Sequence, residues 1–229
     1  MNISPYLQKI TLSFKLSTPL HHVTYLLCSP EQIILRNFLG GCPDPEYQRL
    51  GNKKPAERPK NLITFIQSLY YKKELTEGCG CVITKKEIQQ EIKLAQKIPD
   101  KQLRKKMVDF YQLALKTIQQ RKKLILISPQ KDQHVFNEVL LHELVHELVD
   151  INKLRPRSWK WNEGLVTYLT FFSLNKEKKF EKKPPLTKDK MANIYDTYTH
   201  KWSVLFKHAK NSETRRKILL KQLKKINKQ

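Results

Sequence analysis

The sequence predicts an α+β fold in which a small mixed sheet accompanies several helices. Residues 84–122, 191–208 and 215–228 carry apolar side chains at helical spacing. Residues 124–128 instead form a continuous apolar run with two β-branched members, as in a buried strand. Residues 135–149 are apolar on nearly every side, which is typical of a buried helix. With 229 residues, 39% of them hydrophobic, the chain can bury a sizeable core.

The first 60 residues are predicted to form an extension of strands and a loop. Residues 10–16 alternate apolar and polar side chains, which favours a half-buried strand, and residues 22–28 are a second candidate strand. Glycines and prolines at 40–45 indicate a loop. Residues 51–60 are charged and contain two prolines, which indicates an exposed linker. We therefore place a domain boundary there and assign residues 61–229 to the main domain.

Four cysteines are too few and too scattered to indicate a secreted disulfide framework. Cys79 and Cys81 form a Cys-x-Cys pattern that has three interpretations. Together with Cys28 and Cys42 they can form a metal site of thiolate ligands. One of them can instead reach a metal elsewhere and keep it inactive, or both can be ordinary thiols in a turn.

The middle of the chain is predicted to be mainly helical. Residues 61–73 have helical spacing, and so do residues 84–122, which Pro99 divides into two helices. Thr84 and Glu87 have the spacing of a capping box, which marks the start of the first of these two helices.

A metal-binding pattern, His142-Glu143-x-x-His146, lies in the middle of the apolar helix, for which Asp132 is a candidate N-cap. Residues four apart share one face of a helix, so both imidazoles can reach one metal ion. Glu143 lies about 100° around the helix, beside the metal rather than on it. The alternative is a pair of core histidines whose nitrogens are satisfied by side-chain hydrogen bonds.

A second helix is predicted from Trp159, after a turn containing Pro156. An antiparallel return of the chain would bring Glu163 beside the two histidines as a third ligand. Gly164 lacks a side chain, so this helix can pack closely against the histidine helix. The alternative for Glu163 is a solvated acid in the first turn, stabilised by the helix dipole.

These residues carry a family resemblance. The histidine motif followed by Trp161-Asn162-Glu163-Gly164-Leu165 resembles the gluzincin metallopeptidases, whose third ligand is a glutamate on a "glutamate helix". The Asn-Glu-Gly run is similar to that of aminopeptidase-type gluzincins. The short chain and the short spacing resemble the minigluzincins. The resemblance covers residues 124–175, about a quarter of the chain.

The resemblance implies a zincin-like fold and a zinc metalloendopeptidase that cuts peptides or proteins. His142, His146 and Glu163 would bind Zn²⁺, and Glu143 would be the general base for a metal-activated water. A strand near residues 124–128 forms the upper edge of the cleft in gluzincins, so its free backbone groups would pair with an extended substrate.

A gluzincin site also needs a donor to the oxyanion of the tetrahedral intermediate. Tyr195 and Tyr198 are the first candidates, because a tyrosine or histidine commonly has this role. His200 and Tyr168 are further candidates, and the alternative for each tyrosine is an amphipathic ring with its hydroxyl at the surface. Asn162 and Thr167 are candidate hydrogen-bond partners of the metal-binding histidines.

The chain carries a net charge of +23, and residues 175–229 contribute about half of it, with 17 Lys or Arg against 5 Asp or Glu. Such an excess attracts polyanions, so a nucleic-acid-associated protease resembling SprT-like enzymes is an alternative function. Those enzymes usually have a third histidine where this sequence has Glu163.

A second alternative is a latent or non-catalytic protein in which four ligands close the zinc site. The sequence contains no run of eighteen apolar residues and no basic, then apolar, leader pattern, so we expect no membrane span, no secretory signal and a cytoplasmic protein.

Overall fold

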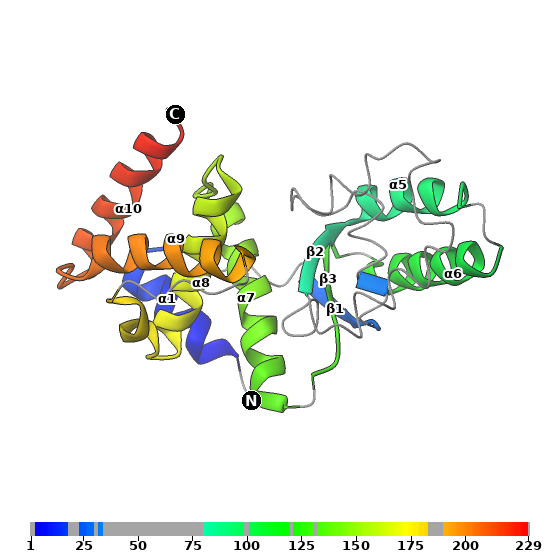
Figure 1. Ribbon diagram of the computed structural model, residues 1–229, viewed down its shortest axis with the longest axis horizontal. Coiled ribbons are helices and arrows are strands. Elements are labelled where there is room, and N and C mark those ends of the chain that lie inside the picture. The colour runs from blue at the N-terminus through cyan, green and yellow to red at the C-terminus, as the bar shows by residue number, and fades with distance from the viewer. Residues whose placement is uncertain are drawn as a thin grey trace. The chain divides into compact units, whose positions relative to one another are not determined.

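The computed structural model is mixed α+β, as predicted, and the residues that it describes are mostly helical with a three-stranded sheet (Figure 1). Several sequence predictions lie outside the described residues: the loop at 40–45, the linker and domain boundary at 51–60, the helix at 61–73, and Cys42 and Cys79. The structure describes residues 3–17, 23–29, 32–33, 80–98, 101–119, 121–130, 132–182 and 190–228.

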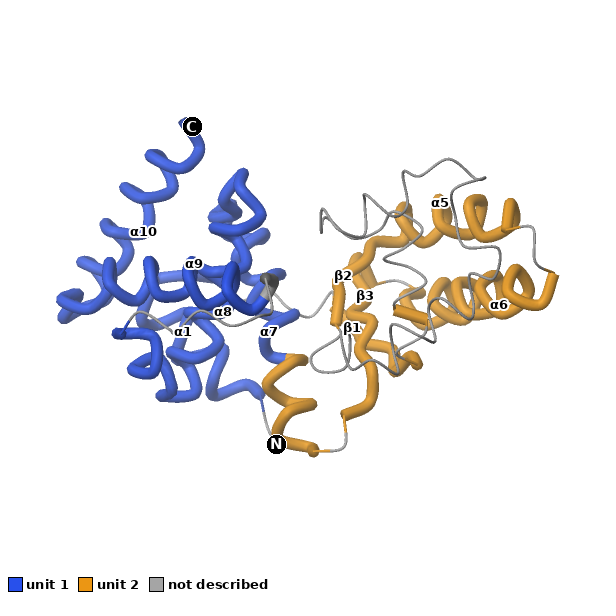
Figure 2. Tube along the Cα trace, in the orientation of Figure 1, with its two compact units in different colours: residues 1–20, 141–229 blue, residues 21–140 orange. Residues whose placement is uncertain are grey.

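The chain divides into two compact units (Figure 2). Residues 21–140 form one unit, and residues 1–20 join residues 141–229 in the other. The N-terminal segment therefore belongs to the unit that contains both histidines and Glu163. None of the helices that the structure describes is long and apolar enough to cross a membrane.

The sheet lies in the unit formed by residues 21–140. Its strands β1 (Val23–Leu27), β2 (Gly80–Thr84) and β3 (Lys123–Ile127) are arranged in the order β1-β3-β2. Strand β3 pairs in parallel with β1 and antiparallel with β2. The expectation that residues 124–128 form a free edge is therefore wrong. Backbone groups of β3 are paired on both sides, which is consistent with its nearly continuous burial.

Helices α5 (Lys85–Ala95) and α6 (Lys101–Ile118) confirm the predicted helical pair. The capping box at the start of α5 is present: the Thr84 hydroxyl accepts from the Glu87 backbone N–H, and the Glu87 carboxylate accepts from the Thr84 backbone N–H. One core cluster joins these helices to the sheet through buried residues at helical spacing on each helix and at alternate positions on β3: Ile88, Ala95, Leu103, Met107, Phe110, Tyr111, Ala114, Ile118, Leu124 and Leu126.

The first segment of the chain is a helix, α1 (Ser4–Phe14), and the predicted strand at residues 10–16 is wrong. The period-two pattern required Leu12 to face the core, but Leu12 is 69% exposed. Ile10 and Phe14 are fully buried, four residues apart on one helical face. Pro5 fits the first turn of a helix, where its missing N–H leaves no bond unmade.

Among the described residues after β3, five helical segments follow: α7 (Gln133–Ile151), α8 (Trp159–Ser173), the 3₁₀ segment η4 (Glu177–Phe180), α9 (Lys190–Phe206) and α10 (Ser212–Ile226). Asp132 caps α7 as predicted, because its carboxylate accepts from the His134 backbone N–H at 2.7 Å. The short η4 segment lies between α8 and α9 in the sequence.

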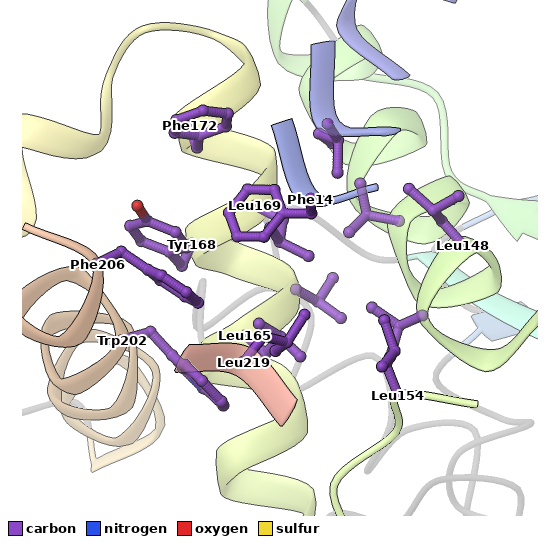
Figure 3. Close-up of a cluster of buried hydrophobic side chains, with 14 of the residues drawn as sticks. Phe14, Leu148, Leu154, Leu165, Tyr168, Leu169, Phe172, Trp202, Phe206 and Leu219 are labelled. Carbon is purple, nitrogen blue, oxygen red and sulfur yellow. The ribbon is translucent and has the colours of Figure 1, made fainter. Parts of the chain in front are cut away.

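Aromatic side chains form the centre of the second core cluster (Figure 3). The Phe14 ring of α1 makes edge contacts with Phe172 of α8 and Phe206 of α9, at centroid distances of 5.5 and 5.2 Å. Tyr168 and Trp202 stack on Phe206 at 5.1 and 5.7 Å. Aromatic rings bury large apolar areas, so this cluster fastens the N-terminal helix to the helices that follow the histidine motif.

Gly164 lies where α8 and α9 approach each other closely. A Cβ added at Gly164 would lie 2.5 Å from the Cβ of Tyr198 and 2.6 Å from its carbonyl carbon. The sequence predicted a close contact with α7 instead. That prediction is wrong, because Gly164 is about 100° around α8 from Glu163, which points its carboxylate at the histidines of α7.

Replacing Gly164 with Ala is expected to destabilise the protein by about 1–3 kcal/mol, because backbone of α9 must move to admit the methyl group. The sign of this change in the free energy of unfolding is informative, because replacing Gly with Ala within a helix otherwise stabilises a protein by about 1 kcal/mol. Urea unfolding of the metal-free protein measures the change. Lys160→Ala, a partly exposed position of the same helix, is the control and is expected to stay within about 0.5 kcal/mol. A Gly164→Ala variant more stable than the wild type would contradict the close contact.

Candidate metal centre

Two histidines of α7 and one glutamate of α8 converge on one point. The Nε2 atoms of His142 and His146 lie 3.5 and 3.4 Å from the same carboxylate oxygen of Glu163, Oε2. One ligand atom from each of the three residues lies within 4.8 Å of the others, and the group can hold a metal ion. This is the arrangement that the sequence predicted from the four-residue spacing and the return of the chain.

Local structure explains the convergence. His142 and His146 are one helical turn apart on α7, and their rings lie edge to face with centroids 4.9 Å apart. The chain then reverses: the Leu154 backbone N–H donates to Val149 and ends α7, and Pro156 is buried in the turn before α8. Glu163 lies in the second turn of α8, where this reversal brings it back to the histidines.

The donor set fits a borderline-soft divalent metal. Two imidazole nitrogens and one carboxylate oxygen are the ligands that zinc takes at catalytic sites, where a fourth position stays open. Zinc bonds of about 2.0–2.1 Å in a tetrahedron separate the ligands by about 3.3–3.4 Å, close to the distances between Glu163 and the histidines. The three ligand side chains are 15–23% exposed, so the group is only partly buried.

The charges at this centre are strongly coupled. Burial alone would lower the pKa of His146, but the charge and hydrogen bond of Glu163, together with the charges of Glu143 and Asp150, raise that pKa from 6.5 to about 9. Burial alone would raise the pKa of Glu163, but the two imidazoles lower it well below its usual value. In the metal-free protein the raised pKa of His146 favours a positive charge next to Glu163, where a metal cation would bind.

Asn162 contacts the ring nitrogen of His146 that faces away from Glu163. Its Nδ2 lies 3.4 Å from Nδ1 of His146, and its Oδ1 is buried without a hydrogen-bond partner among the described residues. Turning the amide over exchanges the two atoms, whose assignment follows from hydrogen bonding. Oδ1 then accepts the Nδ1–H of His146 and leaves Nε2 free for a metal. The prediction that Asn162 orients a ligand is thus consistent with the geometry.

Glu143 follows His142 directly and is only 6% exposed. It is not a member of the three-residue ligand group. Its charge nevertheless acts on the ligands, because it contributes to the raised pKa of His146. A carboxylate whose charge acts on a ligand without belonging to the ligand group is a candidate general base.

The candidate oxyanion donors lie on α9 and are partly buried. Tyr198 packs its ring edge-on against Trp161 at 5.2 Å, and its backbone meets Gly164, the residue after ligand Glu163. Tyr195 lies one turn earlier on the same helix. His200 is directed elsewhere, since its Nδ1 lies 2.7 Å from the Phe180 carbonyl oxygen, and Tyr168 belongs to the aromatic core.

Two further features bear on the predicted ligands. Asp150 was not predicted to act at this centre, although it follows His146 by four residues, the spacing that places side chains on one helical face. Thr167 is buried, and its hydroxyl has no hydrogen-bond partner among the described residues, so it does not support a histidine there.

Cys28 and Cys81 are the cysteines that the structure describes. Cys28 follows β1 and is buried, and Cys81 belongs to β2. Neither is part of a metal-ligand group within the part of the chain that the structure describes. Comparisons of the chain with protein-family models, with curated proteins and with solved structures found no match.

Proposed function

We propose that this chain is a zinc-dependent metalloendopeptidase of the gluzincin type, similar to the minigluzincins, with a zincin-like active site. The observation that carries the proposal is the convergence of His142, His146 and Glu163 within 4.8 Å, with Glu143 buried beside them. Nitrogen and oxygen donors from two adjacent helices, left partly open to solvent, favour a catalytic zinc over a structural one.

A zinc ion held by these three side chains would act as a Lewis acid and lower the pKa of bound water. Glu143 takes the proton of the attacking water and later delivers it to the leaving amine. Asn162 holds the His146 ring in the tautomer that presents Nε2. Tyr195 or Tyr198 donates a hydrogen bond to the oxyanion that forms from the scissile carbonyl. The substrate is a peptide or a protein.

Removal and return of the metal test the proposal. We expect the purified chain to bind about one zinc ion and to cleave members of a peptide library, to lose cleavage after chelation, and to regain it when zinc is added. Elemental analysis and mass spectrometry of the peptides give the two readouts. Zinc bound without any cleavage would contradict the peptidase proposal, and no zinc binding would return the two histidines to the role of core residues.

A further inference from the structure

Helix α10 has one face in the core and an opposite face covered by lysines. Leu219, Leu223 and Ile226 are buried in the second core cluster. Leu219 is labelled in Figure 3. The exposed residues Lys217, Lys221 and Lys224 follow at spacings of four and three, and Lys228 is exposed in the turn after the helix. These four residues, which we call the lysine stripe, form a row because such spacings return to one side of a helix.

Few acidic residues lie near the lysine stripe in the sequence to balance its positive charge. Between residues 190 and 228 the only acids are Asp196 and Glu213. Glu213 precedes the stripe, and its carboxylate is bonded to Lys15, the residue after α1. This bond, with a smaller effect from the charge of Lys217, lowers the pKa of Glu213, so this one acid is shared between Lys15 and the start of the stripe. Lysines three or four residues apart on a helix repel one another. A helix face that serves only for solubility is better with positive and negative charges interspersed. The lysine stripe carries positive charges alone, and their repulsion is unfavourable until an anion binds over them.

The far end of the lysine stripe is held in place by the turn before α8. The Arg157 backbone N–H donates to the side-chain oxygen of Asn227 at 2.9 Å, and its guanidinium donates to the Asn227 carbonyl oxygen at 3.2 Å. Arg157 is exposed, so it adds a fifth cation beside Lys228. The row is therefore carried by a helix that is packed along its apolar face and fixed at its C-terminal end.

We propose that the lysine stripe binds the phosphate backbone of a nucleic acid. Lys217 and Lys224 are about 10 Å apart along the axis, from a rise of 1.5 Å per residue. One strand of B-form DNA carries a phosphate per about 3.4 Å of axis, so this part of the row faces about three phosphates. Lysine contacts to phosphate need no base sequence, so the binding is non-specific.

An acidic membrane fits this helix less well. Helices that lie in a membrane interface insert an apolar face beside their basic face. The apolar face of α10 is buried in the core, and Leu220 is the exposed large apolar residue on this helix, at 40%. The proposal does not rest on the metal centre, because none of the stripe residues belongs to the ligand group.

Binding of a fluorescent DNA duplex of about 20 base pairs to the full metal-free chain tests the proposal. The variant Lys217→Gln/Lys221→Gln/Lys224→Gln/Lys228→Gln is expected to bind at least about 100-fold more weakly at 50 mM salt. The slope of log affinity against log salt is expected to become less steep by about 3–4, since each lost phosphate contact contributes about 0.9. Circular dichroism confirms folding, and the melting temperature is not expected to fall, because the substitutions remove repulsion.

The matched control is Lys85→Gln/Lys86→Gln/Lys93→Gln/Lys97→Gln, four exposed lysines on and just after α5. It removes the same total charge and is expected to change affinity less than about threefold. Equal losses in both variants would show that only net charge matters and would overturn the proposal. Absence of DNA binding by the wild type, or tighter binding to vesicles of anionic lipid that the stripe variant loses, would overturn it as well.

Discussion

Replacing Glu143 with Gln is expected to lower kcat/KM for peptide cleavage by at least about 1000-fold while zinc content stays near one per chain. General acid–base catalysis by one positioned group contributes about 100- to 10,000-fold. Gln has the shape of Glu but cannot accept the proton of the attacking water. Glu143 lies outside the ligand group, so the metal stays bound.

A second glutamate of α7 provides the control for this variant. Glu138 lies one turn before His142 and is partly buried, so Glu138→Gln removes a similar carboxylate from the same helix. Peptide cleavage and zinc content, measured side by side, are expected to change little in the control. Full cleavage by Glu143→Gln would show that another group is the base. Loss of zinc from Glu143→Gln would show that the residue acts through the metal ligands.

The candidate centre was predictable because its signals are local. The four-residue spacing of His142 and His146 specifies one helical face, and burial of the surrounding apolar residues specifies a helix rather than a loop. The prediction of Glu163 as the third ligand also required the chain reversal that Pro156 indicated. The predicted functions that depend on these residues stay predictions, because geometry alone does not test them.

Errors arose where a short pattern allowed two structures. In the seven residues 10–16, an alternating pattern and a helical pattern place apolar side chains at some of the same positions. The exposure of Leu12 and the burial of Phe14 separate the two cases. The burial of Phe14 depends on Phe172 and Phe206, more than 150 residues away in α8 and α9. No property of the local sequence contains that information.

Contacts between distant segments account for the other errors. Gly164 was correctly identified as a position of close approach, but the helix that approaches it is α9, which begins 26 residues later. Similarly, the apolar run at β3 identified a buried strand but not its neighbours. Its place between β1 and β2 depends on pairings with residues about 40 and 100 positions earlier. Propensity and periodicity describe an element and leave its partners open.

Replacing Glu163 with Ala is expected to weaken zinc binding by about 100- to 1000-fold. Structural zinc sites with four ligands bind with about 10–16 kcal/mol, so one ligand contributes about 3–4 kcal/mol. Titration calorimetry and elemental analysis measure the loss, and cleavage is expected to fall with zinc content. Wild-type zinc affinity in the Glu163→Ala variant would remove this residue from the ligand set and leave the two histidines without the third ligand that the proposal requires.

The pH dependence of stability in the metal-free proteins shows whether Glu163 acts through its charge or only through packing. Glu163 has a lowered pKa, so its contribution to stability is present above about pH 4.5 and is lost as the pH falls. His146 has a pKa raised from 6.5 to about 9, so its contribution is complete below pH 6.5 and disappears as the pH rises through 9. The wild type is therefore expected to exceed Glu163→Ala in stability most between about pH 4.5 and 6.5, with a difference that shrinks toward pH 9. Urea unfolding at pH 6 and at pH 9.5 measures both values. A difference independent of pH would mean that Glu163 stabilises α8 by packing, and that the charge coupling between the two helices does not prepare the site for a cation.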